Sequence, residues 1–365
     1  MERRKNGITT MNAVMVILLA LVIVFAGVAA YGWMRPQGTT TVTVELTLVD
    51  QAKNESTLTI YAGMDTPDFE NKIKPEFLKL YPWATINYVG LGSGEALSRF
   101  VSEYQAGHVA CGVYVGSTGA VETARKSGAI ETYLNPMVDL MAYPNGSYDP
   151  SGTWTPIYTL PVVLLYNTNL VSSSDVPTSY NDLADPKWNG KLVFDSPAIL
   201  NAAGPLFAHL YTILGNASWT TLMNGIKNNN PIILESSSDV YQKVALGEAS
   251  IGIGLVNDYL AGKGTQPVGV AWIDPVTSVA LVGVLAKNAP HPAMAKLFLQ
   301  WWTAAAGQFT IAATGRVPFN GPVAAYTILS GVLPAGTDVV PGGSNNPDYV
   351  ANPEAWSATF TDIFG

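Results

Sequence analysis

From Thr57 onward, short apolar segments alternate with segments of helical pattern, and this alternation limits the possible folds more than any other feature. Thr57–Ala62, Thr85–Val89 and Val109–Val115 carry the β-branched and aromatic residues typical of strands. Loops rich in glycine, serine and threonine follow the second and third of these segments, and a helical pattern follows each loop. Strands that alternate with helices usually form parallel sheets with both faces covered. The sequence therefore predicts an α/β fold.

The same pattern begins again after Pro161. Strands are expected within 162–166, 191–194 and 251–254, with helices between them. A later apolar segment, 279–285, is expected to return to the first sheet. A chain of 365 residues is also long for one hydrophobic core. Both observations favour two lobes.

The lobes are expected to be discontinuous in sequence. Residues 57–160 together with 273–365 would form lobe 1, and residues 161–272 would form lobe 2. The chain would then cross between the lobes near Leu160 and again near Trp272.

An apolar segment near the N-terminus indicates the compartment. No charged residue lies between Lys5 and Arg35, and residues 11–33 are long enough to span a bilayer as a helix. Basic residues precede this segment, so the positive-inside rule places the remainder of the chain outside the membrane. We therefore expect residues 1–35 to hold the protein at the extracellular face of the cell membrane.

Three interpretations of this segment remain open. A retained transmembrane anchor is favoured, because the apolar run is longer than a usual signal core. A secretory signal would be cut near the small residues 26–30 and would release the protein. A prepilin-type signal would be cut after Gly7 and would keep the helix attached. Residues 36–56 begin with a threonine-rich stretch and are expected to form a stalk.

Composition and motifs exclude several classes of protein. The net charge is −8, and no basic block lies outside the N-terminus, so nucleic-acid binding is not expected. The single cysteine, Cys111, and the scattered His108, His209 and His291 do not have metal-site spacing. The chain has no P-loop and no Gly-x-Ser-x-Gly elbow, and Glu95 stands where a dinucleotide fingerprint needs glycine. We expect no catalytic residue, no metal site and no cofactor.

Three loops share one design. Gly92–Gly94, Gly116–Thr118 and Ser236–Ser238 each place small or hydroxyl residues directly before a helix. Helix starts present unpaired N–H groups and the positive end of the helix dipole, which favour anions. Each loop alone is equally well an ordinary helix cap. Their recurrence in one strand–loop–helix context favours a site for a phosphate, phosphonate, carboxylate or metal-bound anion.

Several segments, in this order and spacing, resemble one protein family. The sequence is similar to the ABC-importer solute-binding proteins of the iron, thiamine, polyamine and phosphonate type, through 58–62, 92–95, 165–170, 177–183, 185–191, 247–253 and 315–318. The resemblance implies a two-lobed periplasmic-binding-protein-like fold of type II. It further implies that a small-molecule ligand is held between the lobes and delivered to the permease of an ABC transporter.

The resemblance also implies a set of ligand-binding residues. The positions where family members line the cleft are Tyr61, Ser93, Gly94, Ser117, Thr118, Ser196, Ser237, Ser238, Asp258 and Tyr259. An anionic or zwitterionic solute is the leading expectation, with its acidic group on the loop amides and any amine on Asp258.

Two alternatives stay open. Iron-binding members of the family often have two adjacent tyrosines near the position of Tyr259, where this chain has Tyr259–Leu260, and a histidine that is absent here. Ferric iron therefore remains an alternative ligand. The prepilin-like N-terminus also allows a surface or filament subunit, although such a protein needs no two-lobed cleft.

Overall fold

The computed structural model describes residues 40–141, 148–199, 201–274, 276–319, 339–342 and 347–365. The chain divides into two compact units, Met1–Asp50 and Gln51–Gly365, of which the second is described below by itself. No described helix is long and apolar enough to cross a membrane. The expected anchor, residues 11–33, lies outside the described residues.

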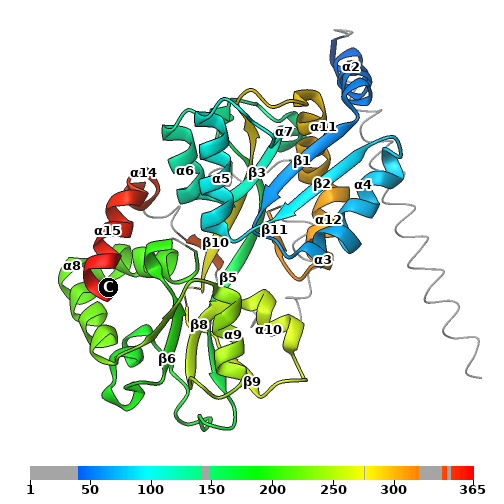
Figure 1. Cartoon of the computed structure of the whole chain (residues 1–365). Helices are drawn as coiled ribbons and strands as arrows, with labels where there is room; N and C mark the ends of the chain where they lie inside the picture. The colour runs from blue at the N-terminus through cyan, green and yellow to red at the C-terminus, as the bar shows by residue number, and fades with distance from the viewer. Residues whose placement is uncertain (1–39, 142–147, 200, 275, 320–338, 343–346) are drawn as a thin grey trace, which may run out of the picture. The chain divides into compact units, whose positions relative to one another are not determined.

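One sheet, in the order β2-β1-β3-β10-β5, forms the framework of lobe 1 (Figure 1). Its strands are β1 (Thr57–Ala62), β2 (Thr85–Gly90), β3 (Val113–Ser117), β10 (Val276–Ala286) and the first half of β5 (Thr155–Asn167). β2 and β3 both run parallel to β1, whereas β10 runs antiparallel to β3 and to β5. Short strands β4 (Ile130–Glu131), β11 (Val317–Pro318) and β12 (Val339–Gly342) pair with β10 or β5.

A second sheet forms the framework of lobe 2. The second half of β5 pairs with β8 (Ile251–Leu255) and with β9 (Val268–Ala271). β8 continues through β6 (Leu192–Asp195) to β7 (Ile232–Leu234), and these three strands run parallel to one another. The α/β class predicted from the strand–helix alternation is confirmed.

Strand β5 joins the two sheets. Its residues up to Pro161 pair with β10, and its residues from Val162 pair with β8. The hydrogen-bonded strand order is therefore continuous from β2 to β7, and the two lobes share β5. The chain returns between the end of β9 at Ala271 and the start of β10 at Val276.

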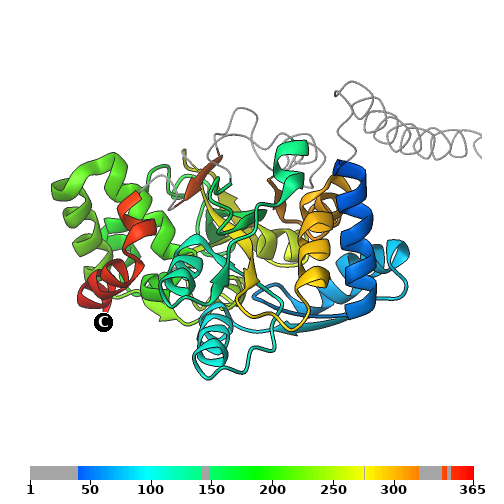
Figure 2. The same cartoon turned by 90° about the horizontal axis from the view of Figure 1, so that it is seen from above.

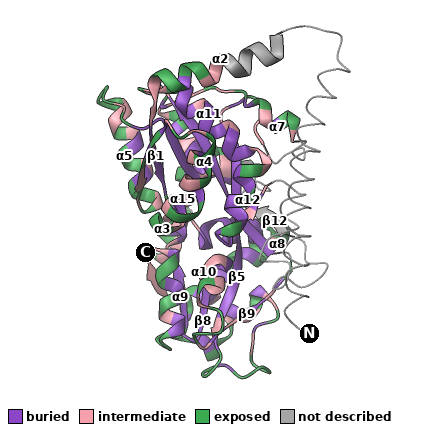
Figure 3. Cartoon of the chain, turned by 90° about the vertical axis from the view of Figure 1, so that its right-hand side faces the viewer, coloured by how far each residue is buried: buried purple, intermediate pink, exposed green. Residues whose placement is uncertain are grey.

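Helices cover both faces of each sheet. In lobe 1, α5 (Ser93–Gln105) and α6 (Thr118–Lys126) lie on one face, and α11 (Pro292–Thr303) and α12 (Ala305–Ala313) on the other (Figures 1 and 2). In lobe 2, α9 (Ser237–Ala245) packs on β8 and β6. The central strands are buried, the edge strand β2 is partly exposed, and the outer faces of α5 and α9 are exposed (Figure 3).

Helix α8 (Ala203–Asn228) covers the other face of the lobe 2 sheet and is longer than the sequence suggested. Gly215 has φ of 73° and ψ of 163°, so two helical segments meet there at a break. Glycine tolerates this positive φ because it has no Cβ.

Shorter elements complete the described fold. These are α2 (Thr40–Glu55), α3 (Thr66–Asp68), a π-helical turn at Phe69–Ile73, α4 (Lys74–Leu80), α7 (Pro136–Leu140), α10 (Val256–Gly262) and α14 (Pro347–Ala351), with 3₁₀ turns at Tyr180–Ala184, Pro186–Trp188 and Pro197–Ile199.

The C-terminal helix α15 (Pro353–Phe364) packs on lobe 2, although its sequence position had been grouped with lobe 1. The rings of Phe360 and Phe364 contact Phe207 of α8, and Trp356 contacts Trp219. Glu354 also reaches α6 in lobe 1 through a 3.0 Å ion pair with Lys126. The end of the chain therefore contacts both lobes.

Candidate functional site

The carboxyl ends of the parallel strands in both lobes face the same stretch of β5. In lobe 1, Ser117 at the end of β3 lies opposite Leu281 of β10, which in turn lies opposite Tyr158 of β5. In lobe 2, Leu255 at the end of β8 lies opposite Val162 of β5. Tyr158 and Val162 are about 13 Å apart along an extended strand. The loops that follow the strands therefore approach this junction from both sides.

Two of the predicted loops lie at this edge of lobe 1. Ser93 and Gly94 begin the first turn of α5. The backbone of Gly63 lies close to Ser93, because a Cβ on Gly63 would be only 3.1 Å from Ser93 Oγ. Ser117 caps α6 by accepting a 3.3 Å hydrogen bond from the Ala120 N–H, and Thr118 is buried behind it. Ser117 thus has a capping role in addition to its position at the strand end.

Tyr61 does not point to the junction. Its ring is fully buried in the lobe 1 core, and its hydroxyl donates a 2.8 Å hydrogen bond to Glu103 Oε1, with the Arg99 guanidinium 4.6 Å from the ring centre. Burial and the contact with Glu103 raise the pKa of Tyr61. Glu103 lies near the C-terminal end of α5, whereas Ser93 lies at its start. The side chain of Tyr61 therefore serves the core rather than the junction.

In lobe 2, a buried carboxylate joins the predicted loop Ser236–Ser238 to the start of α8. Asp195, at the end of β6, accepts hydrogen bonds from the Ala202 and Ala203 N–H groups at 2.9 and 2.8 Å. It also accepts a 2.6 Å bond from the Ser237 hydroxyl, and Asn201 donates to the same hydroxyl. Burial raises the pKa of Asp195, although these donors oppose the shift. Ser237 is thereby committed to a structural contact.

Two further serines remain closer to solvent. Ser196 is half-buried, and its N–H donates a 2.7 Å bond to the Leu234 carbonyl. Ser238 is exposed, and its hydroxyl lies 2.8 Å from that of Ser236. Both residues follow parallel strands of lobe 2, β6 and β7, at the edge that faces the junction.

Asp258 and Tyr259 lie in the first turns of α10, directly after β8. Both side chains are half-buried, and Asp258 Oδ1 accepts a 2.9 Å hydrogen bond from Asn257 Nδ2. On the lobe 1 side, Leu260 of the same helix is near Gly315, where an added Cβ would lie 3.8 Å from its Cδ1. Helix α10 is therefore an element of lobe 2 that meets lobe 1.

An ion-pair cluster on lobe 1 faces α10, and sequence reasoning identified only part of it. Arg316 is 3% exposed and donates to Asp68 Oδ2 at 2.6 Å and to Asp65 Oδ2 at 3.0 Å. Lys72 also pairs with Asp68 at 2.7 Å, so Arg316 belongs to a structural ion-pair cluster of two cations and two carboxylates. Asp65 and Asp68 follow β1 in an Asp-Thr-Pro-Asp segment. Apart from the two acidic residues, nothing in this segment indicates an ion pair with a distant arginine.

Electrostatic coupling connects this cluster with Asp258 across the lobe boundary. Burial, and then repulsion from Asp65, raise the pKa of Asp258 to about 7, while the positive charge of Arg316 opposes the shift. Burial alone would lower the pKa of the Arg316 guanidinium. The neighbouring Tyr158, Asp68 and Asp65 outweigh burial, and the pKa of Arg316 is raised. Asp258 can therefore change its charge near neutral pH.

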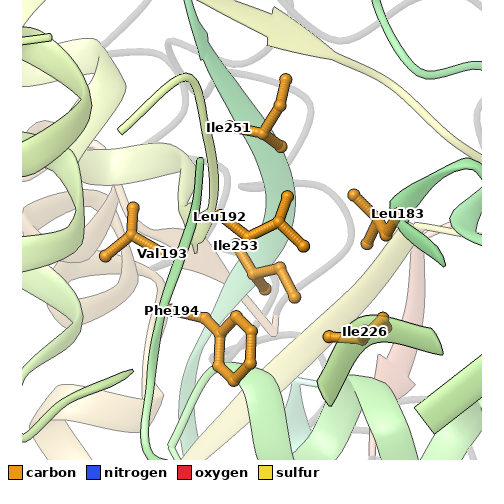
Figure 4. A pocket seen from close by; sticks show the side chains of 7 residues that line it. All are labelled: Leu183, Leu192, Val193, Phe194, Ile226, Ile251 and Ile253. Atoms are coloured by element: carbon orange, nitrogen blue, oxygen red, sulfur yellow. The ribbon is translucent and has the colours of Figure 1, made fainter. Parts of the chain in front are cut away.

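Two pockets lie away from these residues. One gap, between α8 and the lobe 2 sheet, is lined only by apolar side chains such as Leu192, Phe194 and Ile226 (Figure 4). The other has a volume of about 470 Å³ and is lined by residues around α7, among them Tyr133, Asp139 and Trp154. Within the described part of the chain, no three histidine, cysteine or acidic side chains are grouped as a metal site requires.

A family model described as bacterial extracellular solute-binding protein matches residues 114–333. An uncharacterized protein of Haemophilus influenzae is 27% identical over 136 residues, which are 37% of this chain and 39% of that protein. The chain therefore aligns with well under half of that curated relative.

Solved structures share the fold. Iron-bound HitA from Pseudomonas aeruginosa has a TM-score of 0.67 and 17% identity, over 85% of this chain and 99% of that one. The periplasmic binding protein AfuA from Actinobacillus pleuropneumoniae, with fructose-6-phosphate bound, has a TM-score of 0.70 and 20% identity, over 84% of this chain and 98% of that one. The two-lobed periplasmic-binding-protein-like fold is confirmed by these likenesses.

Proposed function

We propose that this chain, which belongs to the family of bacterial extracellular solute-binding proteins, binds a small anionic or zwitterionic solute between its lobes and delivers it to the permease of an ABC importer. The observation that carries this proposal is the register of β3, β5 and β8. It directs the strand ends of both lobes toward the same segment, Tyr158–Val162. In open α/β sheets, ligands bind outside the carboxyl ends of the strands.

The solute class follows from the groups at these strand ends. The starts of α5 and α6 offer backbone N–H groups and the hydroxyls of Ser93 and Ser117. Gly94 and Thr118 continue these turns, and Ser196 and Ser238 supply hydroxyls from lobe 2. Tyr61 and Ser237 are better assigned to support, because their hydroxyls are bound to Glu103 and Asp195. AfuA, a structural neighbour, was solved with a phosphorylated sugar.

Ferric iron is the second candidate cargo. HitA, another neighbour, was solved with iron, and Tyr259 lies beside Asp258 at the lobe boundary. Phenolate and carboxylate oxygens are suitable hard ligands for ferric iron. Iron held in this way would give a coloured complex that is lost in Tyr259→Phe.

We further propose that residues 1–35 anchor the protein at the outer face of the membrane and that the chain catalyses no reaction. Lobe 1 (57–160 and 273–365, apart from α15, which packs on lobe 2) and lobe 2 (161–272) would close on the solute by bending where β5 and the segment before β10 cross between them. Closure is the state that a permease would recognise.

Native mass spectrometry of protein purified under non-denaturing conditions is the most direct test. A bound mass of small-molecule size, lost on partial unfolding, is expected. Small-angle scattering should show a smaller radius of gyration when the solute is present. A protein that carries and binds no small molecule, or that turns over esters, phosphates or nucleotides in a saturable way, would contradict the proposed function.

A further inference from the structure

On the basis of the proposed function, we infer that the solute carries a protonated amine, and that Asn257 and Asp258 at the start of α10 form the subsite for it. The solute would then be zwitterionic, with its ammonium group on lobe 2 and its acidic group at the helix starts of lobe 1. This inference selects one member of the solute class proposed above.

Unpartnered hydrogen-bond acceptors are the first observation. Asp258 Oδ2 and Asn257 Oδ1 are each inaccessible to solvent and have no hydrogen-bond partner among the described residues. The one bond between these side chains uses Asn257 Nδ2 and Asp258 Oδ1, so it satisfies neither of the two free oxygens. Buried acceptors without donors are rare in native proteins and cost free energy. Asn257 Oδ1, and Asp258 Oδ2 in the ionised form of the carboxyl group, each require a donor.

The second observation is a buried hydroxyl next to the same helix, α10. Tyr241 of α9 is 5% exposed, and its hydroxyl has no partner among the described residues. It approaches α10 so closely that a Cβ on Gly262 would overlap it, and burial, followed by the nearby Asp258 carboxylate, raises the pKa of Tyr241. A hydroxyl can accept from an ammonium group as well as donate. Three polar groups without partners among the described residues thus lie on α10 and on α9, the helix that packs against it.

The charged groups across the boundary also favour a cation. Arg316 is the cation that faces Asp258 from lobe 1, but its two terminal nitrogens are bound to Asp68 and Asp65. Asp68 is also paired with Lys72 at 2.7 Å, so two carboxylates face two cations and the cluster has no net charge of its own. An ionised Asp258 would add one negative charge that no described cation pairs with. A ligand ammonium group would relieve this repulsion, whereas a ligand acid placed there would increase it.

Matched ligand pairs provide the test, with isothermal titration calorimetry and thermal shift as readouts. The pairs are 4-aminobutanoate with butanoate, 3-aminopropylphosphonate with propylphosphonate, and glucosamine 6-phosphate with glucose 6-phosphate; ferric iron alone is a further probe. Within at least one pair, the amine should bind at least tenfold more tightly at pH 8, since a charge-assisted hydrogen bond is lost without it. Asp258→Asn should remove this preference, whereas Asp239→Asn, which alters an exposed acid on α9, should keep it.

Several outcomes would overturn the inference. They are equal binding of both members of every pair that binds, an unchanged preference in folded Asp258→Asn, no binding by any amine, or iron binding that depends on Asp258. A carried solute without basic nitrogen in native mass spectrometry would also overturn it, while leaving the proposed function intact. A protein that carries no solute and does not change its radius of gyration would instead contradict the proposed function itself.

Discussion

The Ser237 hydroxyl donates a 2.6 Å hydrogen bond to Asp195, and this bond joins the loops that follow β6 and β7. Asp195 is fully buried and also accepts from two N–H groups at the start of α8. One carboxylate therefore fixes the positions of two helix starts in lobe 2.

Replacing this carboxylate should be costly. Asp195→Ala leaves the Ala202 and Ala203 N–H groups and the Ser237 hydroxyl without their acceptor, and each bond to a charged group contributes about 1.5–3 kcal/mol. The free energy of unfolding should fall by about 3 kcal/mol or more in urea titrations. Ser238→Ala, which changes an exposed neighbour, is the control and should have little effect. Similar stability of both variants would contradict the role assigned to Asp195.

Arg316 should be a second determinant of stability. Arg316→Met leaves Asp65 without its partner and Asp68 paired with Lys72 alone, and losing the hydrogen bonds of a buried guanidinium should cost about 1.5–3 kcal/mol. Lys79→Met breaks an exposed pair with Glu76 and should cost about 0.5 kcal/mol or less. Chemical denaturation of the two variants compares these values directly. A loss below 1 kcal/mol for Arg316→Met would argue against a structural ion pair.

Solute binding should depend on the start of α5. Ser93→Ala removes one hydroxyl donor, and loss of a charge-assisted bond should weaken binding about tenfold or more. Ser98→Ala changes an exposed serine one turn further along the same helix and should bind as the unmodified protein does. Calorimetry with the carried solute measures both. Equal affinities would remove Ser93 from the site.

The pH dependence of stability should reveal Asp258. Its pKa is raised from 3.8 to about 7, so the folded protein holds this proton more tightly than the unfolded chain does. The stability that this provides is complete below pH 3.8 and is lost as the pH rises through 7. Asp258→Asn should therefore raise the melting temperature of the ligand-free protein more at pH 8 than at pH 5. An increase that is the same at both values would contradict an ionised Asp258 at pH 8.

His209 should have the opposite pH dependence. It is 4% exposed on α8, neither ring nitrogen has a partner among the described residues, and burial lowers its pKa below 6.5. The folded protein thus binds this proton less well than the unfolded chain, and stability is lost as the pH falls below 6.5. His209→Leu should lessen the loss of stability between pH 7 and pH 5. The free energy of unfolding, measured by urea titration at pH 7 and pH 5, tests this. The same loss between the two pH values in His209→Leu and the unmodified protein would exclude this role.

The sequence alone determined the arrangement of strands and helices and the class of protein. Period-two and helical patterns are local, and the glycine- and serine-rich loops at 92–94, 116–118 and 236–238 were recognisable because helix starts select these residues. The crossing near Pro161 could be predicted because the pattern began again there.

Only the tertiary structure decided what the individual side chains do. Tyr61 and Ser237 both lie on segments that the sequence assigned to the ligand site. Their hydroxyls instead donate hydrogen bonds to Glu103 and Asp195, which are 42 residues away in each case. Asp65, Asp258 and Arg316 come from three distant segments, and their coupling depends on which lobe faces which. Sequence patterns report local periodicity, whereas hydrogen bonding, burial and charge coupling depend on distances that only the folded chain sets.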